Sequence, residues 1–301
     1  MTSSTVTTFR QELKVLACLA LFLLGLELYA RHLAPTLDRD RAHIHQFPEL
    51  IASLPEKNGA LFLGNSLILH GLDESLLHQE APDLAFIKLS PVSTAALDWE
   101  HLYQRYLATA GHKPDRLFLG FVAHHLNDSE PPKLRRLSRH FASVDTLPGL
   151  WKNEHLDIHE RTQSALAHSF ALIGDQPAHR ERILDAFIDW YRLGLRTNQE
   201  WVTQKTSSPP PKATFHRIER FLAHCRADGI QVFLIPMPQP EPWDLDPQTD
   251  RLVNDYNLKI LDARSLPGMT PDDFSDGYHL GESGAQKFTH WLAQQPEVTG
   301  R

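Results

Sequence analysis

Two short stretches, Leu61-Phe-Leu-Gly-Asn-Ser66 and Asp276-Gly-Tyr-His279, decide how this chain folds and where its chemistry lies. The first is an apolar strand that runs into a tight turn with a serine hydroxyl at its tip. The second places a carboxylate three residues before an imidazole, so that one turn can direct both into the same site. A serine becomes a useful nucleophile when a base takes its proton, and the base needs a carboxylate that fixes its tautomer. The chain therefore offers a nucleophile, an orienting acid and a base in the order Ser66, Asp276, His279.

The pattern between these stretches predicts an α/β fold with a five-stranded parallel sheet. Strands that alternate with helices are typical of such a sheet, and near-continuous apolar strands indicate that both of its faces are covered. Ser66 then lies at the carboxyl edge of the sheet, where open α/β folds hold their ligands. The expected strands span 60–64, 84–89, 116–120, 230–236 and 258–263, and the expected helices span 74–79, 95–110, 213–228, 248–255 and 282–294.

An apolar stretch of 16 residues, 15–30, stands near the start of the chain. It is shorter than the roughly 20 residues that cross a bilayer core, but Leu33 and a snorkelling Glu27 can extend it. We therefore predict a membrane anchor through residues 15–33, inside a tail and anchor segment at 1–34. A cleaved signal peptide and a buried soluble helix are the alternatives, and Leu28-Tyr-Ala30 is a poor cleavage site.

The flanks of this stretch do not fix its orientation, because basic residues stand on both sides. The short N-terminal tail suits an anchor whose bulk is exported. We therefore expect a single-pass membrane protein with its globular domain in the periplasm or outside the cell. Residues 35–57 are polar and carry three prolines, which predicts a stalk that leads into that domain.

The main domain is expected over residues 58–297, with an interruption at 128–211 that breaks the alternation of strands and helices. The interruption carries Trp151, Trp190 and Trp201 and ends in a proline-rich run. We predict a mostly helical insertion. It is either a cap over the carboxyl edge of the sheet or ordinary helical decoration with core aromatics.

Composition excludes one class of partner. The net charge of the 301 residues is −7, whereas phosphate binding needs a basic surface, so no nucleic-acid partner is expected.

The cysteines and histidines predict neither a disulfide nor a metal site. Cys18 lies in the apolar stretch and Cys225 in an expected helix, which does not predict a disulfide. The 18 histidines are scattered, and the adjacent His124 and His125 would point to opposite faces of a strand, so no metal site is expected.

The two opening stretches resemble the SGNH (GDSL-type) hydrolase superfamily. Gly64-Asn65-Ser66 is similar to the Gly-Asp-Ser block of that family, with Asn in place of Asp, and the segment from Asp276 to His279, followed by Leu-x-x-x-Gly-Ala, is similar to its last block. Residues 230–238 also resemble the strand before that block. The resemblance implies a flavodoxin-like three-layer sandwich, with Ser66 as nucleophile, His279 as base and Asp276 as its orienting partner. This mechanism requires no metal and no organic cofactor.

The family also implies an oxyanion hole, and here the sequence leaves several candidates. The second family block supplies a glycine N–H, but Lys88-Leu-Ser90-Pro-Val-Ser93 has no glycine, so Ser90 or Ser93 is expected to stand in. The third block supplies an Asn side chain, and the spacing does not choose among His124, His125 and Asn127. Asn65 is a further binding candidate, because it stands next to the nucleophile.

The anchored branches that this chain resembles include the alginate O-acetylation proteins and the D-alanyl-lipoteichoic acid transfer protein. The resemblance implies an esterase or O-acyltransferase that acts on an exported or cell-envelope polysaccharide beside a membrane-bound acyltransferase. One alternative is a catalytically weak accessory protein that binds polymer or scaffolds an assembly complex, because a fold alone does not guarantee chemistry. Another is a soluble lipase-like hydrolase.

Overall fold

The computed structural model describes residues 3–188 and 214–300, and these divide into two compact units. The first, called the helical unit below, comprises Met1–Ala42, Leu134–His140 and Leu147–Ser207. The second, called the α/β unit, comprises His43–Lys133, Phe141–Thr146 and Ser208–Arg301.

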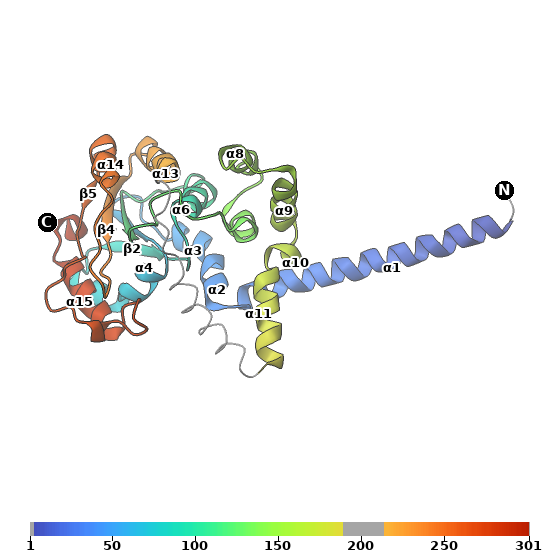
Figure 1. Cartoon of the computed structure of the whole chain (residues 1–301), viewed down its shortest axis with the longest axis horizontal. Coiled ribbons are helices and arrows are strands. Elements are labelled where there is room, and N and C mark those ends of the chain that lie inside the picture. The colour runs from blue at the N-terminus through green and yellow to red at the C-terminus, as the bar shows by residue number, and fades with distance from the viewer. Residues whose placement is uncertain (1–2, 189–213, 301) are drawn as a thin grey trace. The chain divides into compact units, whose positions relative to one another are not determined.

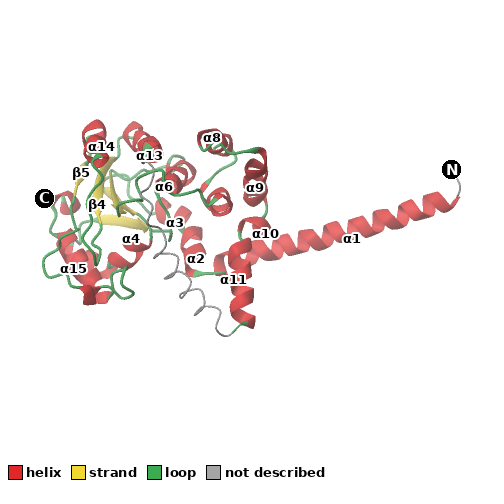
Figure 2. Ribbon diagram, viewed as in Figure 1, coloured by secondary structure: helices red, strands yellow, loops and turns green. Residues whose placement is uncertain are grey.

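The α/β unit is built on one sheet of five parallel strands in the order β2-β1-β3-β4-β5 (Figures 1 and 2). This is the strand order of flavodoxin-like folds, so the predicted fold class is confirmed. β5 is the shortest strand, with only two residues of the expected run forming a ladder. The strands are β1 (Gly59–Leu63), β2 (Ala85–Leu89), β3 (Arg116–Phe121), β4 (Gln231–Pro236) and β5 (Lys259–Ile260).

Helices of the α/β unit connect these strands and follow the last of them. The helix expected at 95–110 starts as α6 and continues as a π-helical turn over Tyr103–Leu107. The helices are α3 (Phe47–Ala52), α4 (Ser66–Gly71), α5 (Glu74–Glu80), α6 (Ala96–Leu102), α13 (His216–Ala227), α14 (Gln248–Tyr256), α15 (Glu282–Ala293) and α16 (Pro296–Thr299).

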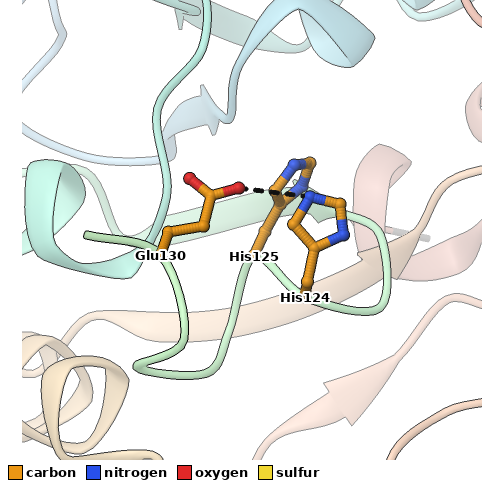
Figure 3. A group of neighbouring side chains, drawn as sticks. All are labelled: His124, His125 and Glu130. Atoms are coloured by element: carbon orange, nitrogen blue, oxygen red, sulfur yellow. Dashed lines mark ion pairs between the residues drawn. The ribbon is translucent and has the colours of Figure 1, made fainter. Parts of the chain in front are cut away.

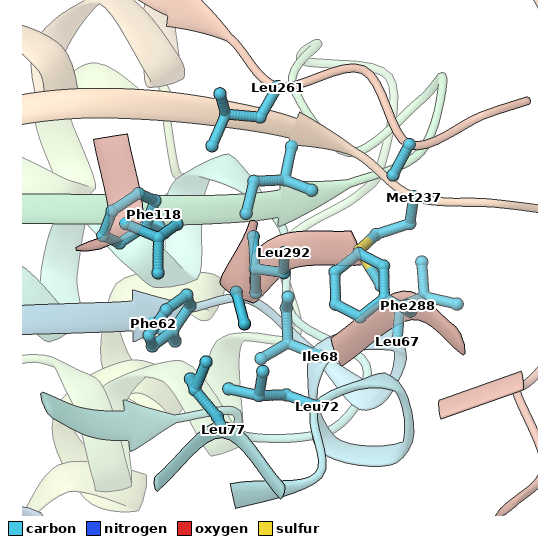
Figure 4. Close-up of a cluster of buried hydrophobic side chains, with 14 of the residues drawn as sticks. Phe62, Leu67, Ile68, Leu72, Leu77, Phe118, Met237, Leu261, Phe288 and Leu292 are labelled. Carbon is cyan, nitrogen blue, oxygen red and sulfur yellow. The ribbon is translucent and has the colours of Figure 1, made fainter. Parts of the chain in front are cut away.

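The core of this unit joins the two ends of the chain that carry the candidate site. Phe62 of β1, Phe118 of β3 and Phe233 of β4 are buried in matching register, and their ring centroids lie 4.8 and 4.9 Å apart. Phe288 and Leu292 of α15 belong to the same cluster (Figure 4). Burying one such side chain stabilises a fold by roughly 1.5–3 kcal/mol. The cluster therefore fixes the strand before Ser66 against the helix that follows His279.

The segment predicted as a polar stalk is partly folded instead. α2 (Arg39–His45) and α3 form within it, and Phe47 and Ile51 of α3 are buried at 0% and 4% exposure. The Phe47 ring meets the edge of the Tyr106 ring at 5.7 Å. Phe47, Ile51 and Leu54 have the i, i+4, i+7 apolar spacing of one helix face. The prolines of this segment led to the prediction of an extended stalk in place of this helix.

The helical unit begins with a long helix, α1 (Ser3–Leu33). The segment Glu12–Thr36, which covers most of α1 and the three residues after it, has a mean hydropathy of 2.0 and is long and apolar enough to cross a membrane. The insertion is helical, as predicted, over its described part, while Trp190 and Trp201 lie outside the described residues. The insertion helices of this unit are α7 (Leu134–Arg136), α8 (Leu147–Asn153), α9 (Ile158–Ser169), α10 (Ala171–Gly174) and α11 (Gln176–Phe187).

One buried carboxylate ties the three segments of the helical unit together. Asp175 has no exposed surface, and its carboxylate accepts hydrogen bonds from Arg41 Nε at 2.7 Å and His140 Nε2 at 2.8 Å. Burial alone would raise the pKa of Asp175, but the bonds and charges of His140 and Arg41 hold it below its usual value. An unpaired charge at such a position would be strongly destabilising, so the three segments depend on one another.

Candidate active site

Ser66 stands where β1 ends and α4 begins. Asn65 caps this helix, because its Oδ1 accepts the N–H of Leu67 at 3.0 Å, a donor that the start of a helix leaves free. Gly64 has no room for a side chain, since a Cβ there would lie 2.6 Å from Ile68. The turn therefore presents Ser66 partly exposed at the carboxyl edge of the sheet.

Two side chains that the sequence did not single out hold this turn. Thr94 Oγ1 donates to the Gly64 carbonyl at 3.1 Å, and Trp99 Nε1 lies 3.3 Å from the same oxygen. Asn65 Nδ2 donates to the Thr94 carbonyl at 3.1 Å. Thr94 and Trp99 stand about thirty residues further along the chain, and no local pattern marks them.

The turn from Asp276 to His279 shapes the second half of the site. Asp276 Oδ1 accepts the N–H groups of Tyr278 at 3.0 Å and His279 at 2.7 Å. Gly277 between them has a φ of 75°, a left-handed conformation that glycine adopts without strain. The carboxylate thus shapes the turn with one oxygen and leaves Oδ2 for the imidazole.

The structure brings Ser66, His279 and Asp276 into one hydrogen-bonded chain. Asp276 Oδ2 lies 2.7 Å from His279 Nδ1, and His279 Nε2 lies 2.9 Å from Ser66 Oγ. An ionised carboxylate is only an acceptor, so Nδ1 carries the proton and Nε2 faces the hydroxyl with a free lone pair. This is the arrangement in which imidazole accepts a proton from serine.

The charge of Asp276 is stabilised where it lies. Partial burial by itself would raise its pKa, but the hydrogen bonds and charge of His279, together with the Tyr278 N–H, lower the pKa to about 2. The Asp276 side chain is 56% exposed and that of His279 is 23% exposed, so the chain of bonds lies at an open surface.

Two further rings flank the imidazole. The His70 ring lies 5.0 Å from that of His279, and the Tyr278 ring lies 4.9 Å away at a steep angle. Burial, followed by the nearby His279, lowers the pKa of His70, so His70 adds little positive charge next to the base. The contact with His279 shows that His70 packs at the site.

Three candidates for the oxyanion hole are engaged in other bonds. Asn65 is 2% exposed, and its amide serves the helix cap and the Thr94 carbonyl. The Ser90 N–H donates to His43 Nε2 at 3.2 Å, and the Ser90 hydroxyl is fully buried. Asn127 Oδ1 accepts the N–H of Ser129 at 3.0 Å, which turns the amide toward its own loop. These bonds give all three residues structural roles.

Ser93 and His124 have more freedom. Ser93 is exposed and has a φ of 54°, which is uncommon for a residue other than glycine. Glycine adopts such a left-handed conformation without strain. The His124 side chain is 50% exposed, and its Nε2 lies 3.2 Å from Glu130 Oε1. The bond from His124 lowers the pKa of Glu130. Burial, followed by the charge of Glu130, raises the pKa of Tyr278 beside the imidazole.

His125 is hydrogen-bonded to the turn that carries the nucleophile. Its Nδ1 accepts the N–H of Val122 at 3.2 Å and lies 3.1 Å from Asn65 Nδ2, so the ring proton belongs on Nε2. Burial lowers the pKa of His125 to about 3, and the ring is therefore neutral at ordinary pH. The ring braces Asn65, the neighbour of Ser66.

One nitrogen of His124, one nitrogen of His125 and one carboxylate oxygen of Glu130 lie within 4.8 Å of one another, a spacing that metal ligands can have (Figure 3). The sequence did not foresee Glu130 as their partner. A histidine that binds a metal through one nitrogen donates a proton from the other. In His125 the Nδ1 lone pair already accepts the N–H of Val122, so this nitrogen is not available to an ion. The group is built as a hydrogen-bond network.

Comparison with known proteins adds only distant likenesses. No protein-family model and no curated protein matches the sequence. The fold is similar to that of a solved Bacteroides fragilis protein described as a "putative acylhydrolase", with 10% identity, coverage of 83% of this chain and 93% of that one, and a TM-score of 0.39. It is also similar to an acetylxylan esterase from Geobacillus stearothermophilus, with 11% identity, coverage of 82% and 99%, and a TM-score of 0.35. At these values neither likeness bears on chemistry.

Proposed function

We propose that this chain is a membrane-anchored, SGNH-type serine esterase or O-acyltransferase that acts on an acyl ester of an exported or cell-envelope polysaccharide. The observation that carries the proposal is the chain of bonds from Asp276 through His279 to Ser66, at 2.7 and 2.9 Å. The polysaccharide substrate, the anchor and an acyltransferase partner rest on the family resemblance and on the apolar helix α1.

In the proposed reaction, Ser66 Oγ attacks the ester carbonyl while its proton passes to His279 Nε2. The imidazolium, stabilised by Asp276, then gives that proton to the departing alcohol oxygen, and the acyl group remains on Ser66. Water completes hydrolysis by attacking this acyl-enzyme, whereas a sugar hydroxyl completes transfer. In both cases His279 accepts the proton of the attacking group and returns it to Ser66.

The developing oxyanion needs donors that can be directed at it. The N–H of Ser66 at the start of α4 and the N–H of Ser93 in its left-handed turn are the proposed backbone donors. The proposed side-chain donor is His124, whose Nε2 would exchange its contact with Glu130 Oε1, 3.2 Å away, for the oxyanion. One such donor typically contributes about 10²–10³ in kcat. His124→Ala is therefore expected to lower kcat by that factor without changing the free energy of unfolding, because its side chain is half exposed.

A catalytically weak accessory protein is the second candidate. The observation that favours it is that Asn65, Ser90 and Asn127 are all engaged in structural bonds. The two candidates differ in one result, since an accessory protein would hydrolyse activated esters no faster with Ser66 than without it.

The test is hydrolysis of p-nitrophenyl acetate by the full-length chain in detergent. Ser66→Ala and His279→Ala are expected to reduce the rate to background, whereas Ser75→Ala, a change at an exposed serine of α5, leaves it unchanged. Adding an oligosaccharide and analysing the products by mass spectrometry distinguishes the two reactions, because transfer gives an acylated sugar and hydrolysis gives the free acid. Equal rates in wild type and Ser66→Ala would reject the enzyme and favour the accessory protein.

A further inference from the structure

A carboxylate inside the apolar helix α1 joins this helix to the rest of the helical unit. Glu27 is 7% exposed, and its carboxylate accepts the N–H of Ala171 at 2.8 Å and that of Leu172 at 3.1 Å. These are the first two residues of α10, which lies beside the C-terminal half of α1 (Figure 1). Glu27 thereby satisfies donors that the start of α10 leaves free.

Arg31, one turn further along α1, completes the neutralisation. Its Nε donates to Glu27 at 2.7 Å, and its NH2 group donates to the Ser169 carbonyl at 2.6 Å. Charges in a membrane-spanning segment are costly unless they are paired with one another or with backbone groups. Both charges in this half of α1 meet that condition, and their backbone partners come from residues 169–172.

Helix length places this contact inside the membrane. Residues 15–26, the apolar run before Glu27, number only 12, or about 18 Å at 1.5 Å per residue, whereas a bilayer core is about 30 Å thick. Continuing to Leu33 gives 19 residues, or about 28 Å. A full span therefore includes Glu27. Leu33 stands six positions after Glu27, so the contact with α10 lies about 9 Å inside the end of the span.

The residues on either side of this contact expose apolar side chains. Phe170 is 44% exposed and Leu172 is 36% exposed, and they flank the buried Ala171. Leu166, four residues before Phe170 and one helical turn away, is 40% exposed. Among the described residues, eight large apolar side chains outside α1 are exposed, and six of them belong to the helical unit. Exposed apolar side chains that concentrate in the unit carrying an apolar helix indicate a nonpolar partner for that unit.

We infer that the helical unit docks onto the lipid bilayer through an apolar ledge, Leu166, Phe170 and Leu172, whose depth Glu27 fixes along α1. The ledge reaches the 5–10 Å depth at which interfacial apolar groups are buried. The inference requires that α1 remain in the mature protein, because Glu27 of α1 holds the start of α10. The inference rests on the anchoring part of the proposed function and not on its chemistry.

Spin labels on the full-length chain in phosphatidylethanolamine–phosphatidylglycerol vesicles test this inference. Labels replace Phe170 or Leu172 in a Cys18→Ser background, since Cys225 is fully buried. Val144, a 68% exposed apolar residue of the α/β unit, is the matched reference position. We expect labels at 170 and 172 to collide more with dissolved oxygen and less with an aqueous nickel chelate than the label at 144. Equal collision rates with oxygen and with the nickel chelate at all three positions would contradict the inference that the ledge contacts the bilayer.

Glu27→Leu tests what sets the depth. Leucine makes the span more apolar, so the variant still inserts, but it cannot accept the N–H groups of α10. The label at 172 is expected to lose its protection from nickel, and Glu27→Gln, which keeps one acceptor oxygen, is expected to lose less. An unchanged reading in Glu27→Leu, or a mature protein whose mass shows removal of α1, would contradict the inference. Ser66-dependent ester hydrolysis, measured on the same samples, reports separately on the proposed chemistry.

Discussion

Asp276→Asn gives the sharpest test of how the imidazole is held. Asp276 Oδ1 accepts two backbone N–H groups and Oδ2 faces His279 Nδ1 at 2.7 Å. In the variant, the amide oxygen must take the Oδ1 position, because the backbone donors of Tyr278 and His279 require an acceptor. The amide NH2 then faces Nδ1 and donates to it. The ring proton moves to Nε2, and His279 loses the lone pair that accepts the proton of Ser66.

The expected loss follows from this change of tautomer. Such a substitution in a buried triad lowers kcat by about 10⁴, which is about 5.5 kcal/mol at 1.36 kcal/mol per factor of ten. The Asp276 side chain is 56% exposed, so water screens its charge and makes the effect of removing that charge smaller than in a buried triad. We therefore expect a loss of about 10²–10⁴ in kcat, with little change in KM.

The assay is steady-state hydrolysis of p-nitrophenyl acetate, with thermal unfolding measured beside it. The backbone bonds survive in Asp276→Asn, so the variant should remain folded and lose only the stabilisation that the charge of Asp276 supplies, whereas Asp276→Ala should lose the turn bonds as well and unfold at a lower temperature than Asp276→Asn. A well-folded Asp276→Asn protein that keeps kcat within about tenfold of wild type would refute the tautomer argument.

Three further changes should follow from the packing and the charges of the site. Gly120→Ala places a Cβ 2.3 Å from Ile68 and should lower the free energy of unfolding by about 1–3 kcal/mol in denaturant titrations; a matched Gly111→Ala, with no atom within 4 Å of its Cβ, should not destabilise. Asn65→Ala removes the α4 cap and should lower the free energy of unfolding by about 0.5–2 kcal/mol and lower kcat as well. An unchanged free energy of unfolding and an unchanged kcat would contradict the role of Asn65 as the cap that positions Ser66. The pKa of Asp276 is about 2 in the fold, against 3.8 as the ordinary value, so its stabilising effect is complete above about pH 4 and is lost as pH falls toward about 2. Acid unfolding should accordingly depend less on pH in Asp276→Asn, and equal slopes would disprove the linkage.

The sheet could be predicted from the sequence because its strands are buried on both faces. Five apolar runs separated by helical patterns are enough to indicate parallel strands, and all five formed. β5 shrank to two residues, and the run that predicted it continues through Asp262, a charged residue poorly suited to a buried strand. The helix at Phe47 was missed because two prolines nearby favoured an extended stalk.

The candidate triad was predictable for a different reason. Asp276 and His279 are close in sequence, so their turn is a local property, and the parallel sheet brings the end of β1 to the same edge. The donors around Ser66 were not predictable, because they depend on backbone angles and on distant partners. Nothing in the sequence shows that Ser93 has a positive φ, or that His125 braces Asn65.

Covalent capture of Ser66 tests the central claim most directly. The full-length chain is treated with a fluorophosphonate, which phosphonylates activated serines, and the adduct is located by mass spectrometry of its peptides. The account predicts one adduct on the peptide that contains Ser66, absent in Ser66→Ala and much slower to form in His279→Ala. A folded wild-type protein that remains unmodified at Ser66, or that reacts equally fast without His279, would contradict it.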